Sequence, residues 1–432
     1  MSTPQAPPPA LSPEQAQLAL YGGPRVRPEP FPQRAHIGWE EKAAVDALFE
    51  QAIASGAAPG YNGEQETAYC EAFAAYMGGG YVDAVSSGTA GIYAALKALD
   101  PEPFGEVIVG AVTDPGGLMP VPLLNLVPMI ADSEPGRYNS GPAQIEPLIS
   151  PRTRAILVAH IAGEPADVAG IVDLARAHDL PVIEDCSQSH GALLDGALVG
   201  TFGELAVFST MHGKHHSSGG QGGLIYTRDE ALYQAVRRAS DRGKPFFLPP
   251  GSTNVTASLN LNLNDLAAAI GRVQLKKLPR IVSLRREIVA QLRESTSERT
   301  TVSMPDPIPG ALPSYWFLRL RFHAGRATCD KETYCRALAA EGLSIAASYK
   351  AALPHTMDWF VQRRVFGRSG YPWTSPDYTG DPEQQFPCPN AHQAMEDHFN
   401  LYFYESWGPA EIADAAAIFA KVDRVYAAPK EP

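Results

Sequence analysis

Apolar residues follow two different patterns along this 432-residue chain. In its first half, short apolar runs typical of buried strands alternate with stretches whose apolar residues return every three or four positions, as on one face of a helix. The predicted strands are 81–85, 106–112, 127–131, 155–160, 181–184, 205–209 and 223–227, and helices are predicted at 90–99, 118–125 and 167–179. This alternation predicts an α/β fold, with a mostly parallel seven-stranded sheet between helices.

The regions on either side are mainly helical. Their periodicity predicts amphipathic helices over 39–55 and 64–77, and a long helix over 264–292 that Pro279 is expected to bend. Beyond the long helix, an alternating strand and two helices predict a smaller α+β domain, at 315–322, 331–341 and 409–427.

Two segments interrupt the regular pattern. Residues 1–35 are rich in proline and alanine, and predict an N-terminal arm or a partly disordered leader. Residues 349–385 are rich in Pro, Trp and Tyr; because so long a structureless loop is uncommon, we expect a functional or interface insertion. The sequence therefore predicts an arm over 1–35, a large domain over 36–285, and a small C-terminal domain over 286–432 that carries the insertion.

Composition narrows the class of protein. The net charge of -12 argues against nucleic acid or an anionic membrane as a main partner. No apolar run reaches the roughly 18 residues of a membrane span, and the first residues lack the basic and apolar regions of a secretion signal. The five cysteines are scattered, which favours reduced thiols and a cytoplasmic location.

Candidate chemistry gathers where two of the predicted strands end. Asp185 and Gln188 follow one strand, while Ser209 ends the next and Lys214 follows it. Since ligands of open α/β sheets bind beyond the carboxyl ends of the strands, these four side chains are expected to share a cleft. A lysine, a carboxylate, an amide and a hydroxyl form the set that a pyridoxal phosphate (PLP) enzyme needs.

Each of these residues has a chemical interpretation and a simpler one. Lys214 would hold the aldehyde of PLP and then act as a general base, and Asp185 would face the pyridinium nitrogen. Gln188 would bond the 3'-oxygen of the ring. Taken singly, each also has a simpler explanation: Lys214 as a surface lysine, Asp185 as a helix cap, and Gln188 as an amide that holds a loop in place.

A second polar group lies at the strand-to-helix turn 86–89. Free N–H groups and the helix dipole favour an anion at such a turn, and Gly88 allows close approach. Ser87 and Thr89 add hydroxyl donors, with Ser209 as a further candidate. The turn thus predicts a phosphate site, although a simple helix cap explains the same residues.

Together these segments resemble a known family. SSGTA at 86–90, EDCSQSHGA at 184–192, FSTMHGK at 208–214 and LNLNLNDLAAAIGRVQLKKL at 259–278 are similar to the DegT/DnrJ/EryC1/StrS family. Its members are PLP-dependent sugar and cyclitol aminotransferases of fold type I. The resemblance covers about 35–428 and implies the lysine, pyridinium, 3'-oxygen and phosphate roles just described.

The resemblance also implies an obligate homodimer with shared active sites. Asn260 matches an asparagine that reaches the neighbouring subunit's phosphate. Two positions depart from the family pattern: Asn262 stands where an arginine is common, and Asp114 stands near the place of an aromatic that stacks on the cofactor. The residue that faces the PLP ring is therefore left open.

Histidines near Lys214 allow a metal interpretation. His212, His215 and His216 form an HxxHH pattern that Asp185 or His190 could complete. We predict no metal, because glycine-rich flanks do not hold ligands on one face. His212 is instead expected to contact substrate, and the other two to lie at the surface or an interface.

Two more residues are candidate substrate contacts. His160 ends a strand and either faces the cleft or caps it, and Tyr349 lies where the family brings small-domain residues over the substrate. A loop tyrosine is the simpler interpretation of Tyr349.

The sequence thus predicts an aminotransferase of fold type I. The amino group would pass from glutamate or glutamine to a keto-sugar, nucleotide-linked or not, or to a ketocyclitol, in the biosynthesis of aminosugars, natural products or surface glycans. The alternatives are a PLP-dependent sugar dehydratase and a non-catalytic regulatory relative. Dehydratases of the family replace the lysine by histidine, so Lys214 favours amino transfer.

Overall fold

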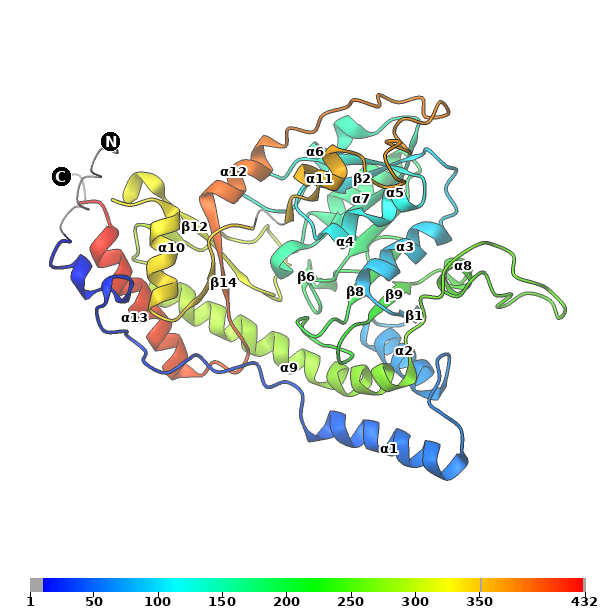
Figure 1. Ribbon diagram of the computed structural model, residues 1–432, viewed down its shortest axis with the longest axis horizontal. Coiled ribbons are helices and arrows are strands. Elements are labelled where there is room, and N and C mark those ends of the chain that lie inside the picture. Colours follow the sequence, from blue (N-terminus) through cyan, green and yellow to red (C-terminus); the bar gives the residue numbers. More distant parts are fainter. Residues whose placement is uncertain (1–10, 350–351, 430–432) are drawn as a thin grey trace, which may run out of the picture.

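The large sheet confirms the predicted α/β architecture. The computed structural model describes residues 11–349 and 352–429 (Figure 1). Seven strands follow the order β1-β9-β8-β5-β4-β2-β3, in which β9 is antiparallel to both neighbours and every other adjacent pair is parallel. The strands are β1 Tyr81–Val85, β2 Glu106–Gly110, β3 Val127–Ala131, β4 Thr153–Ala159, β5 Val182–Asp185, β8 Leu205–Ser209 and β9 Gly223–Thr227.

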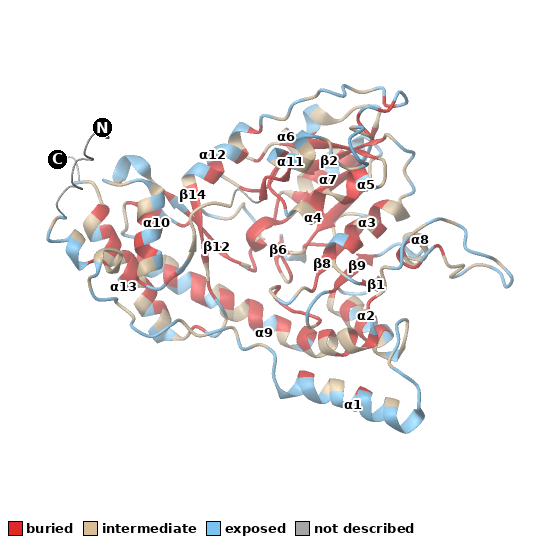
Figure 2. Ribbon diagram, viewed as in Figure 1, coloured by how far each residue is buried: buried red, intermediate tan, exposed pale blue. Residues whose placement is uncertain are grey.

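Helices cover both faces of this sheet, which explains why its strands are apolar throughout. Alternate residues of one strand enter opposite cores: Val107 packs with α3, whereas Ile108 packs with α7. Figure 2 shows the resulting buried layer at the centre of the large domain. The covering helices are α3 Gly88–Ala98 and α8 Glu230–Ser240 on one face, and α2 Glu64–Tyr76, α7 Val168–Ala177 and α9 Asp265–Thr296 on the other.

A second, four-stranded sheet forms the C-terminal domain. Its order is β10-β12-β14-β13 and all its pairs are antiparallel. The second half of α9 and two further helices pack on it, so α9 runs through Pro279 and joins both domains. The elements are β10 Val302–Ser303, β12 Leu318–Phe322, β13 Ser344–Ala346, β14 His398–Tyr402, α10 Lys331–Ala340 and α13 Pro409–Tyr426.

Two predicted elements are corrected. The helix expected over 118–125 is two short helices, α4 Pro115–Leu118 and α5 Pro120–Leu123, each opened by a proline that suits a first helical position. The strand expected from Tyr315 begins only at Leu318, because Tyr315 has a φ of 52°, which takes the chain out of the extended region.

The remaining elements are short or peripheral. Helix α1 Trp39–Ser55 packs against α9. A three-stranded sheet joins residues 193–198 to 311–312. The other α-helices and strands of the described residues are α6 Pro142–Ile145, α11 Asp358–Val361, α12 Pro389–Asp397, β6 Leu193–Leu194, β7 Ala197–Leu198 and β11 Ala311–Leu312. No helix within the described ranges has the length and apolar character that a membrane crossing requires.

The described part of the N-terminal arm is packed rather than loose. Leu18 is fully buried in the core of the small domain. Arg27 bonds Asp414 at 2.7 Å and Glu411 at 3.0 Å, which fixes the arm on α13. Residues 1–10 of the predicted arm lie outside the described residues.

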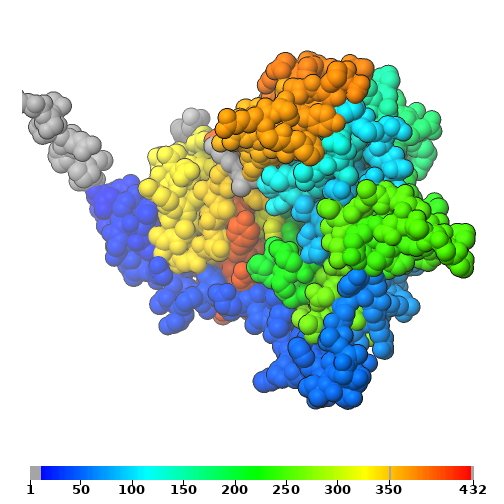
Figure 3. Space-filling model, turned by 45° about the vertical axis from the view of Figure 1, so that its right-hand side comes forward, coloured from blue at the N-terminus to red at the C-terminus, as the bar shows by residue number. Residues whose placement is uncertain are grey.

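The predicted insertion crosses back onto the large domain. After β13, residues 354–386 pack beside β3, with Trp373 and Tyr378 buried against Val127. The Tyr378 hydroxyl donates to Glu106 Oε1 at 2.9 Å, which ties this segment to the start of β2. Figure 3 shows the insertion, in orange, covering cyan parts of the large domain. Residues 350 and 351 lie outside the described part.

Candidate active site

A cavity of about 210 Å³ lies beyond the carboxyl ends of the parallel strands, where α3 begins. Because β4, β5 and β8 are parallel neighbours, their following residues meet there. The structure brings together eight of the predicted site residues in the cavity wall: Ser87, Gly88, Thr89, His160, Asp185, Gln188, Ser209 and Lys214.

Lys214 is a buried amine whose side chain enters this cavity. Its Nζ lies 3.8 Å from the centre of the Trp316 ring, whose Nε1 donates to the Gly213 carbonyl at 2.8 Å. Burial lowers the pKa of Lys214 to about 8, although Asp185 and Asp114 oppose that shift. A larger share of neutral amine near pH 7 makes Lys214 a better nucleophile.

Buried charges fix the turn that carries Lys214. Arg34, from the N-terminal arm, donates to the backbone carbonyls of Lys214 and His215. Its Nε also donates to Glu405 Oε1 at 2.7 Å, and Glu405 Oε2 forms an ion pair with Arg285 Nη2 at 3.0 Å. The arm and the small domain therefore both hold the lysine in place.

Asp185 is a buried carboxylate that needs a cation. Its Oδ1 accepts a bond from Ser187 N at 3.0 Å. Burial raises the pKa of Asp185, while the bonds from Ser187 and the charge of Lys214 lower it. A Cβ at Gly117 would lie 3.3 Å from Asp185 Oδ2, so glycine keeps that oxygen approachable. A protonated ring nitrogen at this oxygen would restore the ionised form.

Gln188 links the cavity to the small domain. Its Oε1 accepts from Ala162 N at 2.9 Å, and its Nε2 donates to the Tyr349 hydroxyl at 3.2 Å. Tyr349 is thereby placed next to the site through Gln188, although it does not line the cavity. Burial raises the pKa of Tyr349, so its hydroxyl stays protonated at neutral pH.

The start of α3 forms an anion cradle. The Ser87 hydroxyl accepts from Ala90 N at 3.0 Å and so caps the helix. A Cβ at Gly88 would lie 2.9 Å from Ser209 Cβ, and one at Gly116 would lie 2.2 Å from Thr89 Oγ1. Glycine at both positions thus lets Ser209 and Thr89 lie close to the start of the helix, where phosphate oxygens would meet its N–H groups.

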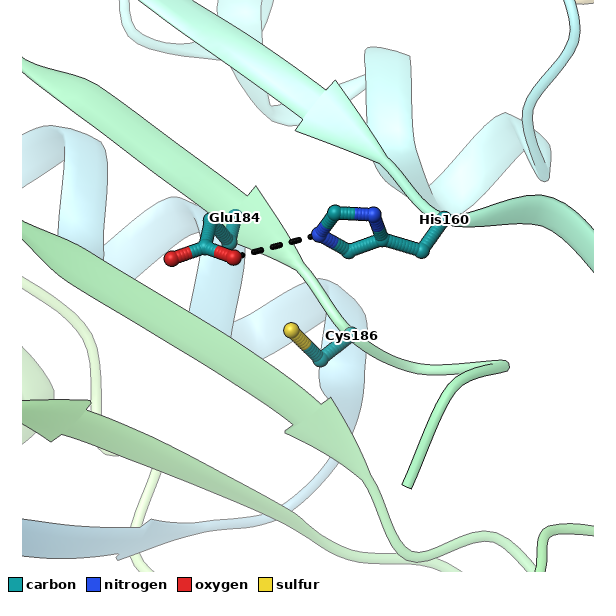
Figure 4. A group of neighbouring side chains, drawn as sticks. All are labelled: His160, Glu184 and Cys186. Atoms are coloured by element: carbon teal, nitrogen blue, oxygen red, sulfur yellow. Dashed lines mark hydrogen bonds and ion pairs between the residues drawn. The ribbon is translucent and has the colours of Figure 1, made fainter. Parts of the chain in front are cut away.

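His160 belongs to a buried group with Glu184 and Cys186 (Figure 4). Its Nε2 lies 3.2 Å from Glu184 Oε2, and its Nδ1 accepts from Ala166 N at 3.0 Å. Both ring nitrogens are therefore occupied within the protein. His160 borders the cavity but keeps no nitrogen free to bond a substrate.

The same group has little capacity to hold a metal. Glu184 already accepts backbone bonds at 2.6 to 2.8 Å from Gly200, Phe202 and Gly203. Burial raises the pKa of Cys186 well above its usual value, which keeps the thiol protonated, whereas metals bind thiolates. The group acts as a hydrogen-bonded anchor between β4 and β5.

The three histidines around Lys214 lie differently from the prediction. His212 is exposed and outside the cavity wall. Placing His215 and His216 at the surface or an interface was wrong, since both are fully buried within the chain itself. The glycine-rich turn folds them inward: Ser218 N bonds the Thr210 carbonyl at 2.9 Å, which closes the segment.

The buried imidazoles form a chain behind Lys214. His216 Nε2 lies 2.7 Å from the Tyr69 hydroxyl, and its Nδ1 lies 2.9 Å from His190 Nδ1. His215 Nε2 bonds the Ser314 carbonyl at 3.1 Å. Burial lowers the pKa of His216 to about 3, so the ring stays neutral at physiological pH.

Two positions noted in the sequence have contrasting locations. Asn260 is exposed and accepts a bond from Asn262 Nδ2 at 2.6 Å, outside the cavity of its own chain. Its reach into a neighbouring subunit stays a prediction. Asp114 does line the cavity, where it caps α4 by accepting from Gly116 N at 2.8 Å.

Sequence reasoning missed Trp316, which lies over the reactive lysine. The chain separates the two residues by about a hundred positions, and Trp316 looked like an ordinary strand residue. Ser187, which bonds Asp185, lies within the recognised EDCSQSH segment and could have been found there.

Comparison with known proteins agrees with this geometry. Residues 40–419 match the DegT/DnrJ/EryC1/StrS aminotransferase family. The L-glutamine:2-deoxy-scyllo-inosose aminotransferase of Streptomyces lividus is 31% identical over 94% of this chain and 97% of its own. The chain therefore belongs to the DegT/DnrJ/EryC1/StrS aminotransferase family.

Solved structures support the fold. An aminotransferase from Psychrobacter cryohalolentis superposes with a TM-score of 0.78 and 23% identity, covering 90% of this chain and 98% of that one. A Bacillus subtilis protein named NtdA, with bound cofactor PMP, has a TM-score of 0.76 and 21% identity, covering 92% and 86%. Family and fold together define this protein as a PLP-dependent aminotransferase.

Proposed function

We propose that this protein transfers the amino group of glutamine, or of glutamate, to a ketocyclitol or keto-sugar in aminosugar or other natural-product biosynthesis. The observation that carries the proposal is the convergence of Lys214, Asp185 and the α3 N-terminus on one buried cavity. A relative named for glutamine and a ketocyclitol matches almost the whole chain, and this supports glutamine and a cyclitol in particular.

The residues present fit PLP. The α3 N-terminus with Ser209 would hold the phosphate, Asp185 would bond the ring nitrogen, and Gln188 would approach the 3'-oxygen. When bound, PLP supplies the electron sink for breaking a bond at the amino-bearing carbon.

Lys214 would have two tasks. Its amine, with a pKa of about 8, would hold the cofactor aldehyde. When it is free, the amine lies over the Trp316 ring inside the cavity, where it would serve as a base. From there it would move the proton at the amino-bearing carbon of the donor, and later return one to the acceptor carbon.

The alternatives have less support. A dehydratase of this family would carry histidine at the lysine position, and the neighbouring histidines lie outside the cavity wall. A non-catalytic relative would have no need for a buried lysine with a lowered pKa beside residues that fit a cofactor.

We also infer a cytoplasmic homodimer with shared sites. Large apolar side chains are exposed on α1 and on the segment that projects beyond α8 in Figure 1, which is unusual for a free surface. Trp39 is 83% exposed and Ile53 82%, while Phe247 and Val255 are exposed on the projecting segment. All five cysteines are free thiols, which supports a reducing compartment.

The proposal is tested with PLP-loaded protein. Glutamine or glutamate should convert the absorption band of lysine-bound cofactor into that of the amino form, and 2-deoxy-scyllo-inosose should restore it. Lys214→Ala should show neither band change, whereas Lys97→Ala, on the outer side of α3, should behave as wild type. A band that persists with every amino donor contradicts the proposal.

A further inference from the structure

A second cavity, of about 540 Å³, lies within the insertion. Its wall comes from 355–374 and 383–386, all within the part that rests on the large domain (Figure 3). None of the residues in its wall belongs to the wall of the Lys214 cavity. The insertion therefore has a concave site of its own.

One side of this cavity is aromatic. The Phe360 ring lies 5.8 Å from Trp373 and 6.4 Å from Phe386, both in edge-on contacts. Trp373 is buried, so the aromatic wall is rigid. Such a surface fits the C–H face of a ring-shaped ligand at little entropic cost.

His355 supplies a buried polar group that lies beside the Ala111 backbone. It is only 6% exposed, and neither ring nitrogen makes a hydrogen bond of good geometry. Burial lowers the pKa of His355 to about 4, so the ring is neutral and offers one donor and one acceptor. The Ala111 backbone can serve only one ring nitrogen, so the other lacks the partner that a buried polar group normally has, and a ligand in the cavity would provide one.

The rim carries both donors and acceptors. Arg363 Nη1 bonds Glu383 Oε1 at 2.9 Å, and Arg368 and Gln384 also line the cavity. Hydroxyl groups both donate and accept, so they match a rim of guanidinium, carboxylate and amide. A phosphate is mainly an acceptor, so it would bond the two arginines but leave the Glu383 carboxylate without a donor.

The geometry points to this cavity as a second binding site, for a polyhydroxylated ring such as a sugar or cyclitol. The site lies close to the reaction centre, since Thr113 of the Lys214 cavity donates its backbone N–H to the Ala352 carbonyl at 2.9 Å, three residues before His355. The bound polyhydroxylated ring is either a distal part of the amino acceptor or a separate polyol molecule. Both present the same hydroxyl groups and C–H face to the cavity.

Saturation-transfer NMR on the PLP-loaded enzyme tests the site with myo-inositol and methyl α-glucoside as probes. Borohydride reduction first fixes the cofactor on Lys214, so the catalytic cavity stays filled. We expect saturable binding that Arg363→Ala with Glu383→Ala weakens about tenfold or more, as loss of charged hydrogen bonds implies. His355→Phe keeps a ring of similar size but removes both nitrogens, so it should weaken the binding as well.

A matched control removes an ion pair elsewhere. Arg176 and Asp173 form an exposed pair at 3.0 Å on α7, and their double alanine variant should bind the probes as wild type does. Absence of saturable binding, or binding unchanged in the cavity variants, overturns the proposal. So does inorganic phosphate binding that depends on Arg363 without polyol binding.

Steady-state kinetics separates the two sources of the ring. If it is part of the acceptor, Glu383→Ala raises the acceptor KM and leaves the half-reaction with glutamine unchanged. If it is a separate polyol, the acceptor KM is unchanged and only probe binding is lost. A failed glutamine half-reaction in wild type would refute the proposed function and leave the binding result standing.

Discussion

Replacing Trp316 by leucine should lower the pKa of the reactive lysine. The Trp316 ring lies 3.8 Å from Lys214 Nζ and stabilises its charged form, an interaction worth about 2 kcal/mol at a desolvated site. Since one pKa unit corresponds to about 1.4 kcal/mol, losing the ring should lower the pKa of Lys214 by roughly 1.5 units. The leucine retains apolar bulk, so the amine stays buried.

The assay needs only the cofactor-free protein. The rate at which an acetylating reagent modifies Lys214, followed by peptide mass spectrometry across pH, gives the pKa of the amine. Lys97, at the surface of α3 near Asp100, provides an internal reference in the same digest. Trp316→Phe retains an aromatic face and should shift the pKa of Lys214 less than leucine does.

An unchanged or higher pKa in the leucine variant would refute this reasoning. It would show that the ring acts on Lys214 mainly by excluding water, since admission of water favours the charged amine.

Three further predictions concern the cofactor and the buried imidazoles. Asp185→Asn preserves shape but removes the charge, so the rate of the glutamine half-reaction, followed by cofactor absorbance, should fall at least about a hundredfold. Gly88→Ala places a methyl group 2.9 Å from Ser209 Cβ and should weaken PLP binding about tenfold or more by titration, while Gly60→Ala, at an open position, should bind normally. His216 stays neutral when folded to about pH 3 but takes a proton when unfolded below about pH 6.5, so stability is lost as pH falls through that window. Urea unfolding at several pH values should therefore show a slope that His216→Gln reduces by about 1.4 kcal/mol per pH unit; an equal slope in both proteins contradicts the buried, neutral ring.

The large sheet was predictable because its signal is local. Strands such as β2 and β8 are short apolar runs bounded by polar turns, and buried parallel strands require that composition. The phosphate turn and the lysine segment were equally readable, because strand ends bring them to one edge of the sheet.

The sequence-based predictions were wrong or incomplete where packing between distant segments decides the position of a side chain. The burial of His215 and His216 depends on how the glycine-rich turn folds under β8, and Tyr69 from α2 completes their contacts. Trp316 reaches Lys214 only because the small domain docks beside the large one. No periodicity in the sequence encodes either contact.

The position of the insertion could not be predicted from the sequence either. Its composition predicted a special role, but its place against Glu106 depends on a contact of Tyr378 across the fold. The predicted division into domains at 285 likewise falls within α9, a single helix from Asp265 to Thr296 that serves both cores.

Transfer of labelled nitrogen tests the central claim most directly. PLP-loaded protein is incubated with 2-deoxy-scyllo-inosose and with glutamine that carries ¹⁵N at its amino group. The mass of the product is then measured by mass spectrometry. The account predicts a singly labelled aminocyclitol from wild type and none from Lys214→Ala. Elimination of water from the cyclitol, or an aminocyclitol formed equally by the alanine variant, would contradict it.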